Sequence, residues 1–149
     1  MIINSRDFGQ VEIDDDEILH FPEGIYAFED IKRYALLSGG DEDNPFMWLQ
    51  ALEGEKPCFI VLDPLSLPEI FSSYKPCIPQ EALDRLELTD SAAARVLVIA
   101  VIRDELADST VNLASPLVIN SVSKTAMQVL LQQEEYGYRH KLFAASGGD

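Results

Sequence analysis

The sequence predicts a mainly β fold, a small antiparallel β-barrel-like or sandwich structure with one or two short helices. Eight prolines divide the chain into short segments, which favour strands over helices. Many of these segments are rich in Val, Ile and Phe and end at Pro-rich or acidic turns, as the strands of barrels and sandwiches do. A length of 149 residues suits one domain. We expect that domain to span residues 1–143, followed by a flexible C-terminal tail at 144–149.

The expected strands follow one another along most of the chain. They are residues 2–4, 8–13, 17–21, 33–37, 46–51, 58–63, 96–103, 109–113 and 117–120. The run 96–102 is continuously apolar and lies between Arg95 and Arg103. It is far too short to span a bilayer, so we expect it to be the most buried strand.

One helix is expected between Pro79 and Glu87. Proline suits the first turn of a helix, Glu81 favours the positive end of its dipole, and Leu83 and Leu86 share a face. The segment 123–133 is ambiguous. Its Lys, Ala, Met, Gln and Leu residues slightly favour helix, whereas a hairpin return onto 117–120 would require a strand.

The chain is strongly acidic, with 26 Asp and Glu against 11 Lys and Arg and a formal net charge of −15. The acids form small clusters at 14–17, 41–43, 104–105 and 134–135, each of which suits a solvated turn. Together they repel nucleic-acid phosphates and anionic membranes. They favour a cationic protein as partner, because a field of one sign speeds the encounter with the opposite charge.

Sequence motifs for catalysis or metal binding are absent. Neither a Gly-rich phosphate loop nor a serine-hydrolase or zinc-protease signature occurs. His20, His140, Cys58 and Cys77 lack the close ligand pairs of a zinc site. We therefore expect no enzyme activity, no metal and no cofactor. The cysteines are expected to be buried free thiols, and the absence of a signal-peptide pattern predicts a cytoplasmic protein.

A series of short strings along the chain resembles the bacterial flagellar assembly factor FliW family. The strings stand in order over nearly the whole chain and are Phe8-Gly9, FPEGIYAFE at 21–29, PFMWLQ at 45–50, Asp63-Pro64, NLASPLVIN at 112–120, and Gln128-Val129 followed by Tyr136 and Arg139. The chain departs from the family at Ser115-Pro116, where an Ala-Pro pair is common, and at Tyr26-Ala27, where a small turn residue is common.

This resemblance implies a small β-barrel-like protein without catalysis that binds the translational regulator CsrA and, alternatively, flagellin. Binding of flagellin frees CsrA to repress flagellin translation, and secretion of flagellin reverses this. The resemblance also implies that 125–131 is a strand that pairs back onto 117–120. We expect a monomer that contacts neither nucleic acid nor membrane directly.

The partner contacts are predicted on exposed aromatic and acidic residues. The proline-bounded segment 67–76 places apolar side chains on a loop or sheet edge, where they either meet a partner or cover the barrel end. We expect anchors at Glu69, Ile70, Phe71 and Tyr74, steering charges at Asp104 and Glu105, and a second region at Glu134, Glu135 and Tyr136. The alternatives are an acidic protein with a different cationic partner, an acidic nucleic-acid mimic, a small enzyme using His20 or His140, and a self-assembling structural subunit.

Overall fold

The computed structural model describes residues 1–6, 8–38, 46–52, 57–64, 71, 74–89 and 93–141. The predicted tail at 144–149 and the acidic cluster at 41–43 lie outside these residues. The elements within them are β1 Ile2–Ser5, β2 Gly9–Glu12, the 3-10 turn Asp15–Glu17, β3 Ile18–His20, β4 Arg33–Ser38, β5 Phe46–Ala51, β6 Cys58–Leu62, α2 Gln80–Arg85, β7 Arg95–Val101, the 3-10 turn Leu106–Asp108, β8 Thr110–Val111, β9 Leu117–Asn120, β10 Thr125–Gln128 and β11 His140–Lys141.

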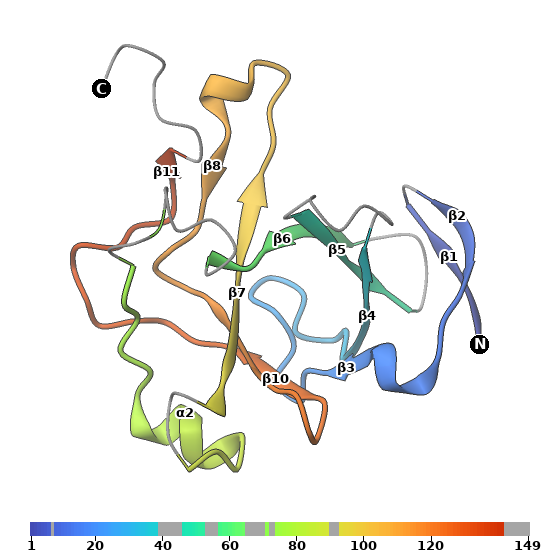
Figure 1. Cartoon of the computed structure of the whole chain (residues 1–149), viewed down its shortest axis with the longest axis horizontal. Coiled ribbons are helices and arrows are strands. Elements are labelled where there is room, and N and C mark those ends of the chain that lie inside the picture. The colour runs from blue at the N-terminus through green and yellow to red at the C-terminus, as the bar shows by residue number, and fades with distance from the viewer. Residues whose placement is uncertain are drawn as a thin grey trace.

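Within the described residues, seven strands close a β-barrel in the order β7, β6, β5, β4, β3, β10, β9 and back to β7. All neighbours are antiparallel except β3 and β10, which are joined in parallel at His20 and Thr125. The last two residues of β7, Ala100 and Val101, pair instead with β8, and β11 follows β8 at the outer edge. Figure 1 shows the hairpin of β1 and β2 on one side of the barrel and α2 near its base. The predicted mainly β fold is confirmed.

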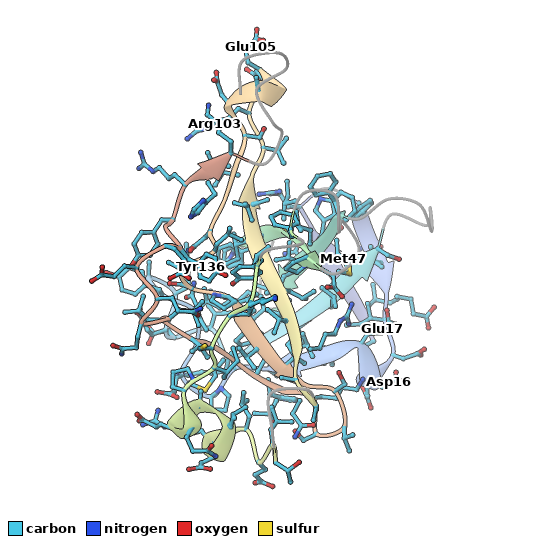
Figure 2. All side chains as sticks on the ribbon, turned by 60° about the vertical axis from the view of Figure 1, so that its left-hand side comes forward. Asp16, Glu17, Met47, Arg103, Glu105 and Tyr136 are labelled. Carbon is cyan, nitrogen blue, oxygen red and sulfur yellow. The ribbon has the colours of Figure 1, made fainter. Side chains whose placement is uncertain are left out.

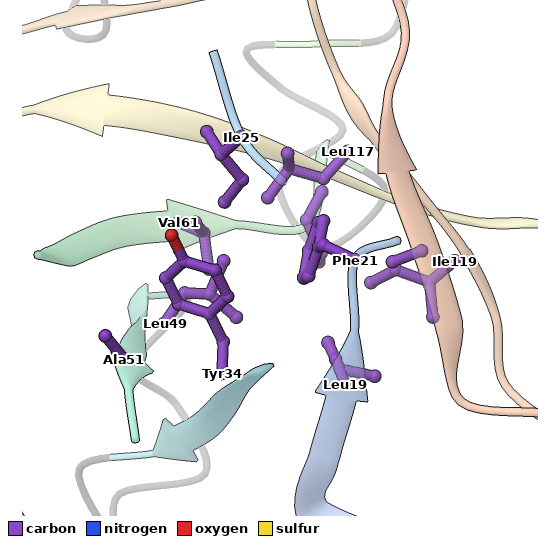
Figure 3. Close-up of a cluster of buried hydrophobic side chains, with 11 residues drawn as sticks. Leu19, Phe21, Ile25, Tyr34, Leu49, Ala51, Val61, Leu117 and Ile119 are labelled. Atoms are coloured by element: carbon purple, nitrogen blue, oxygen red, sulfur yellow. The ribbon is translucent and has the colours of Figure 1, made fainter. Parts of the chain in front are cut away.

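The barrel interior is filled by side chains from every wall. Figure 3 shows Tyr34, Phe21 and Leu49 pointing toward one another, with Val61 and Leu117 beside them. Each of these five side chains is almost completely buried. At 25 cal/mol for each Å² of apolar surface, burial of one such side chain stabilises the fold by about 2 kcal/mol. The alternation of strand residues therefore sets the barrel register, because a slip of one residue would move this set to the outside.

The most buried strand is β9, not the predicted run 96–102. Every residue of β9 is buried, whereas β7 alternates between buried and partly exposed positions. The reason is that both faces of β9 are covered. Leu117 and Ile119 point into the barrel core, and Val118 packs in the cluster under α2.

The predicted helix at 79–87 is confirmed as α2, with Pro79 as its N-cap residue. Ala82, Leu83 and Leu86 pack against Val129 and Leu131. The helix favoured by propensity at 123–133 is wrong. Residues Thr125–Gln128 form β10, which pairs with β9 as the family resemblance implied, although the strand ends at Gln128 and not at residue 131.

Tertiary structure overrides helix propensity at this point because Asn120 fixes the reversal before β10. Its side-chain oxygen accepts hydrogen bonds from the backbone N–H groups of Val122 and Ser123, at 3.0 and 3.2 Å. Its amide donates to the carbonyl of Leu86 at 2.8 Å. Lys124 then takes a positive φ of 62°, which turns the chain into β10.

Other local predictions have mixed outcomes. The acidic cluster 14–17 is an exposed turn, as predicted. Among the described residues neither cysteine forms a disulfide. Cys58 is buried but Cys77 is exposed, which corrects the expectation of two buried thiols. Cys77 lies on the outer, irregular segment before α2. In the part of the chain that the structure describes, no helix has the length and apolar character needed to cross a bilayer.

Candidate partner-binding surfaces

Phe71, the central predicted anchor, lies in the core. It is 7% exposed and packs with Leu62, Val98, Ala100 and Val111. This cluster fills the space between β6, β7 and β8. Glu69 and Ile70, the two anchors predicted beside it, lie outside the described residues. The part of the predicted segment that the structure describes therefore supplies packing at Phe71 and a half-buried ring at Tyr74.

Tyr74 and Tyr136, predicted in separate regions, meet in the fold. Their rings pack edge to face with 4.7 Å between the centroids. The hydroxyl of Tyr74 donates to the carbonyl of Leu113 at 2.8 Å, and the hydroxyl of Tyr136 accepts from the N–H of Lys75 at 2.8 Å. Burial, and secondarily the proximity of Tyr136, raises the pKa of Tyr74.

Gln133 extends the same seam. Its side-chain oxygen accepts from the N–H of Cys77 at 2.7 Å, and its amide donates to the carbonyl of Lys75 at 3.0 Å. The segment before α2 is thus held to the segment before β11 by side chains that replace a strand ladder. The Tyr74 and Tyr136 pair therefore connects these two segments, and both rings are half-buried.

The predicted acidic residues lie at separate places on the surface. Glu134 and Glu135 are exposed beside the tyrosine pair, and Asp104 and Glu105 are exposed in the connection between β7 and β8. Figure 2 shows Glu105 at the far end of that connection, well separated from Tyr136. The structure therefore brings Tyr74, Glu135 and Tyr136 together and leaves Asp104 and Glu105 apart from them.

A surface groove of about 580 Å³ was missed by the sequence analysis. Its lining comes from the loop after β3, the segment before β9, and the end of β10 with the chain that follows. The lining residues are Glu23, Gly24, Tyr26, Glu29, Asn112, Ser115, Met127, Gln128, Leu130 and Tyr138. Tyr26 in the first of these segments and Gln128 in the last are 102 positions apart in the sequence, so only the fold reveals their meeting.

Gln128 joins the walls of the groove. Its side-chain oxygen accepts from the N–H of Tyr26 at 2.8 Å, and its amide lies 3.4 Å from the carbonyl of Ser115. Asn112 in turn accepts from the N–H groups of Ala114 and Ser115 at 3.1 and 3.0 Å. Residues from three of the strings that carry the family resemblance thus line one groove. These strings, at 21–29, at 112–120 and at Gln128, are the sequence signal that could have located it.

The loop after β3 needs glycine at position 24. Gly24 has a φ of +70°, and a Cβ atom there would stand 2.5 Å from the backbone Cα of Glu29. An L side chain would be strained by the dihedral angle and would collide with backbone that cannot move aside. The close packing of this loop therefore requires the glycine of the FPEGI string.

The two histidines lie in different parts of the fold. His20 is exposed at the end of β3, and the Nε2 atom of His140 accepts the N–H of Gly137 at 2.6 Å. Among the described residues, no three His, Cys, Asp or Glu side chains gather closely enough to hold a metal ion. His140 fixes the turn before β11, which is a structural task.

Comparison with known proteins agrees with the fold and with the strings. A family model described as FliW protein matches residues 2–142. The flagellar assembly factor FliW of Ruminiclostridium cellulolyticum is 35% identical over 140 residues, which cover 94% of this chain and 93% of that protein. The flagellar assembly factor FliW of Caldicellulosiruptor saccharolyticus is 34% identical over 142 residues, with coverages of 95% and 90%.

A crystal structure of the flagellar assembly factor FliW superposes on the chain with a TM-score of 0.85 and 28% identity. The match covers 97% of this chain and 98% of that one. The chain therefore belongs to the FliW family, a family of non-enzymatic flagellar assembly factors.

Proposed function

We propose that this flagellar assembly factor binds the translational regulator CsrA and, alternatively, flagellin, and so couples flagellin translation to flagellin secretion in the cytoplasm. The observation that carries the proposal is the formal charge of −15 on a member of this family. CsrA-type proteins present basic RNA-binding surfaces, which an acidic protein attracts over distances of about a Debye length, ~10 Å at 0.1 M salt.

The exposed acids predicted from the sequence support this assignment. Glu134 and Glu135 are exposed beside the tyrosine pair, and Asp104 and Glu105 are exposed in the connection between β7 and β8. Charges at the periphery of an interface mainly set the rate of association. We propose that these four carboxylates steer the basic regulator toward the protein.

The test is a calorimetric titration of the purified chain with purified CsrA and with purified flagellin, separately and together. The proposal requires that both bind and that prior saturation with flagellin weakens the binding of CsrA. Affinity for CsrA should also fall as salt is raised, because the attraction is screened. If neither protein binds at micromolar concentration, the partner-switch function is refuted for this chain.

A further inference from the structure

The groove presents three large apolar side chains to solvent. Tyr26 is 83% exposed in the loop after β3, and Leu130 and Tyr138 are each 60% exposed in the chain after β10. Single exposed apolar residues are ordinary on a protein surface. Convergence of three on one concave site is different, because it offers a partner a contiguous area to remove from water.

Tyr26 is held in place by its neighbours. Ile25 is buried in the barrel core, and the ring of Phe28 packs against Phe59 with 5.6 Å between centroids. The backbone of Tyr26 itself donates to Gln128. Figure 1 shows this light-blue loop beside β10. Because the backbone at Tyr26 is already fixed, only its few side-chain torsions lose freedom when the residue is covered, which suits an interface anchor.

The loop also carries backbone strain next to Tyr26. Ala27 adopts a φ of 74°, which costs about 1 kcal/mol or more for a residue with a Cβ atom. The side chain of Glu29 accepts the N–H of Ala27 at 3.1 Å and helps to hold this turn. Strain of this kind persists where the surrounding structure over-determines the conformation, and it gathers at binding sites.

The charges at the groove are unbalanced toward the negative. Glu23 and Glu29 line it, and none of its lining residues is Lys or Arg. Arg85 of α2 lies 2.7 Å from both carboxylate oxygens of Glu23 and 2.9 Å from Glu81. One guanidinium therefore serves two of the three carboxylates at this rim, and a negative excess remains for a cationic ligand.

We propose that this groove docks a segment of the basic regulator in which a lysine or arginine stands beside a large apolar side chain. The apolar side chain packs between Leu130 and the two tyrosines, and the cation lies near Glu29, over the face of Tyr26 or Tyr138. This inference rests on the proposed function and adds the docking site to it. The groove lining includes neither Tyr74 nor Tyr136.

The test compares groove variants with matched surface variants in titrations against purified CsrA. Tyr26→Ala and Leu130→Ser remove exposed apolar side chains from the groove. Val122→Ala is the apolar control, because Val122 is 94% exposed and outside the groove lining. Glu29→Gln removes a carboxylate charge from the groove and should also weaken CsrA binding. Asp16→Asn is its charge control, because Asp16 is exposed on the 3-10 turn before β3. Thermal unfolding of every variant verifies that its fold is retained.

We expect Tyr26→Ala to weaken CsrA binding roughly tenfold or more, as loss of an anchor does. Leu130→Ser should weaken it in the same direction, while Val122→Ala and Asp16→Asn bind as the parent does. If the parent binds CsrA and the folded double variant Tyr26→Ala with Leu130→Ser binds it equally well, the groove assignment is overturned and the proposed function stands.

Two other outcomes also overturn the assignment. If the double variant loses flagellin binding and keeps CsrA binding, the groove is a flagellin site. Self-association of the parent that the double variant abolishes, measured by sedimentation, gives it to a second copy of the chain. If the parent binds neither CsrA nor flagellin, the proposed function fails and this inference fails with it.

Discussion

The ring of Tyr34 meets the ring of Phe21 edge to face at the centre of the barrel, with 5.3 Å between their centroids. The Tyr34 side chain is completely buried, and its hydroxyl has no hydrogen-bond partner among the described residues. A buried hydroxyl without a partner costs about 1–3 kcal/mol relative to its hydrated state. The site therefore keeps the aromatic packing at the expense of a desolvated polar atom.

We expect Tyr34→Phe to leave stability unchanged or to raise it by about 1 kcal/mol, because the ring contacts remain and the desolvated hydroxyl is removed. Urea unfolding at neutral pH measures this free energy. Tyr34→Leu is the control, since it removes the ring as well and should destabilise the protein by ~1–2 kcal/mol. A loss of more than about 1 kcal/mol in Tyr34→Phe would mean that the hydroxyl is hydrogen-bonded in solution.

Tyr34 also predicts a loss of stability at alkaline pH. Burial raises the pKa of Tyr34 to about 12, whereas an unfolded tyrosine titrates near 10. The unfolded state therefore releases its proton first, and the contribution of Tyr34 to stability falls as pH rises from about 10 to about 12. Urea unfolding at about pH 8 and about pH 11 should show a smaller decline for Tyr34→Phe than for the parent. Equal declines would show that Tyr34 ionises normally.

Much of the fold follows from local sequence patterns. The strand at 46–51 and the helix after Pro79 could be placed because apolar alternation and a terminal proline act within a few residues. The segment 123–133 could not be placed by propensity, because Asn120 and the pairing with β9 decide its structure. Local sequence patterns also could not predict that β9 is more buried than β7, since this depends on α2 covering one face of β9.

The candidate sites were harder to predict for the same reason. Proline boundaries predicted a loop or sheet edge for the segment 67–76, but they carry no information on which way the Phe71 ring points. The ring points into the core. Conversely, Tyr26 gave no pattern that marks it as exposed, because its exposure results from Ile25 and Phe28 anchoring the loop on either side.

The C-terminal cap of α2 predicts a stabilising substitution. Leu88 donates to the carbonyl of Leu83 at 2.9 Å, and Glu87 donates to Asp84 at 3.1 Å with a φ of 57°. This is the Schellman pattern, in which glycine is the usual residue at the position of Glu87. We expect Glu87→Gly to raise the unfolding free energy by about 0.5–1 kcal/mol. Glu87→Ala is the control, because it removes the charge and keeps the strained dihedral angle, and an equal gain there would assign the effect to charge.

Phe71→Ala separates packing from binding. Loss of a buried phenylalanine ring is expected to cost about 3 kcal/mol or more of unfolding free energy. Phe8→Ala, at an exposed ring that touches Trp48, should cost far less. Titration of folded Phe71→Ala with CsrA, well below its unfolding midpoint, then tests the anchor role predicted from the sequence. Affinity equal to that of the parent would assign Phe71 to the core alone.

The acids between β7 and β8 predict a kinetic effect without a large effect on complex lifetime. Asp104→Lys with Glu105→Lys changes the formal charge by two units at each position, from −15 to −11. We expect CsrA association at low salt to slow by roughly three- to tenfold with a flatter salt dependence, because peripheral charges act on the encounter. The dissociation rate should change little.

The matched control for this pair is Asp15→Lys with Asp16→Lys, which makes the same change in net charge on the exposed 3-10 turn before β3. Figure 2 shows Asp16 far from Glu105, across the length of the molecule. Stopped-flow association rates at several salt concentrations distinguish the two pairs. If both pairs slow association equally, steering comes from the charge of the whole protein, and Asp104 and Glu105 have no local role.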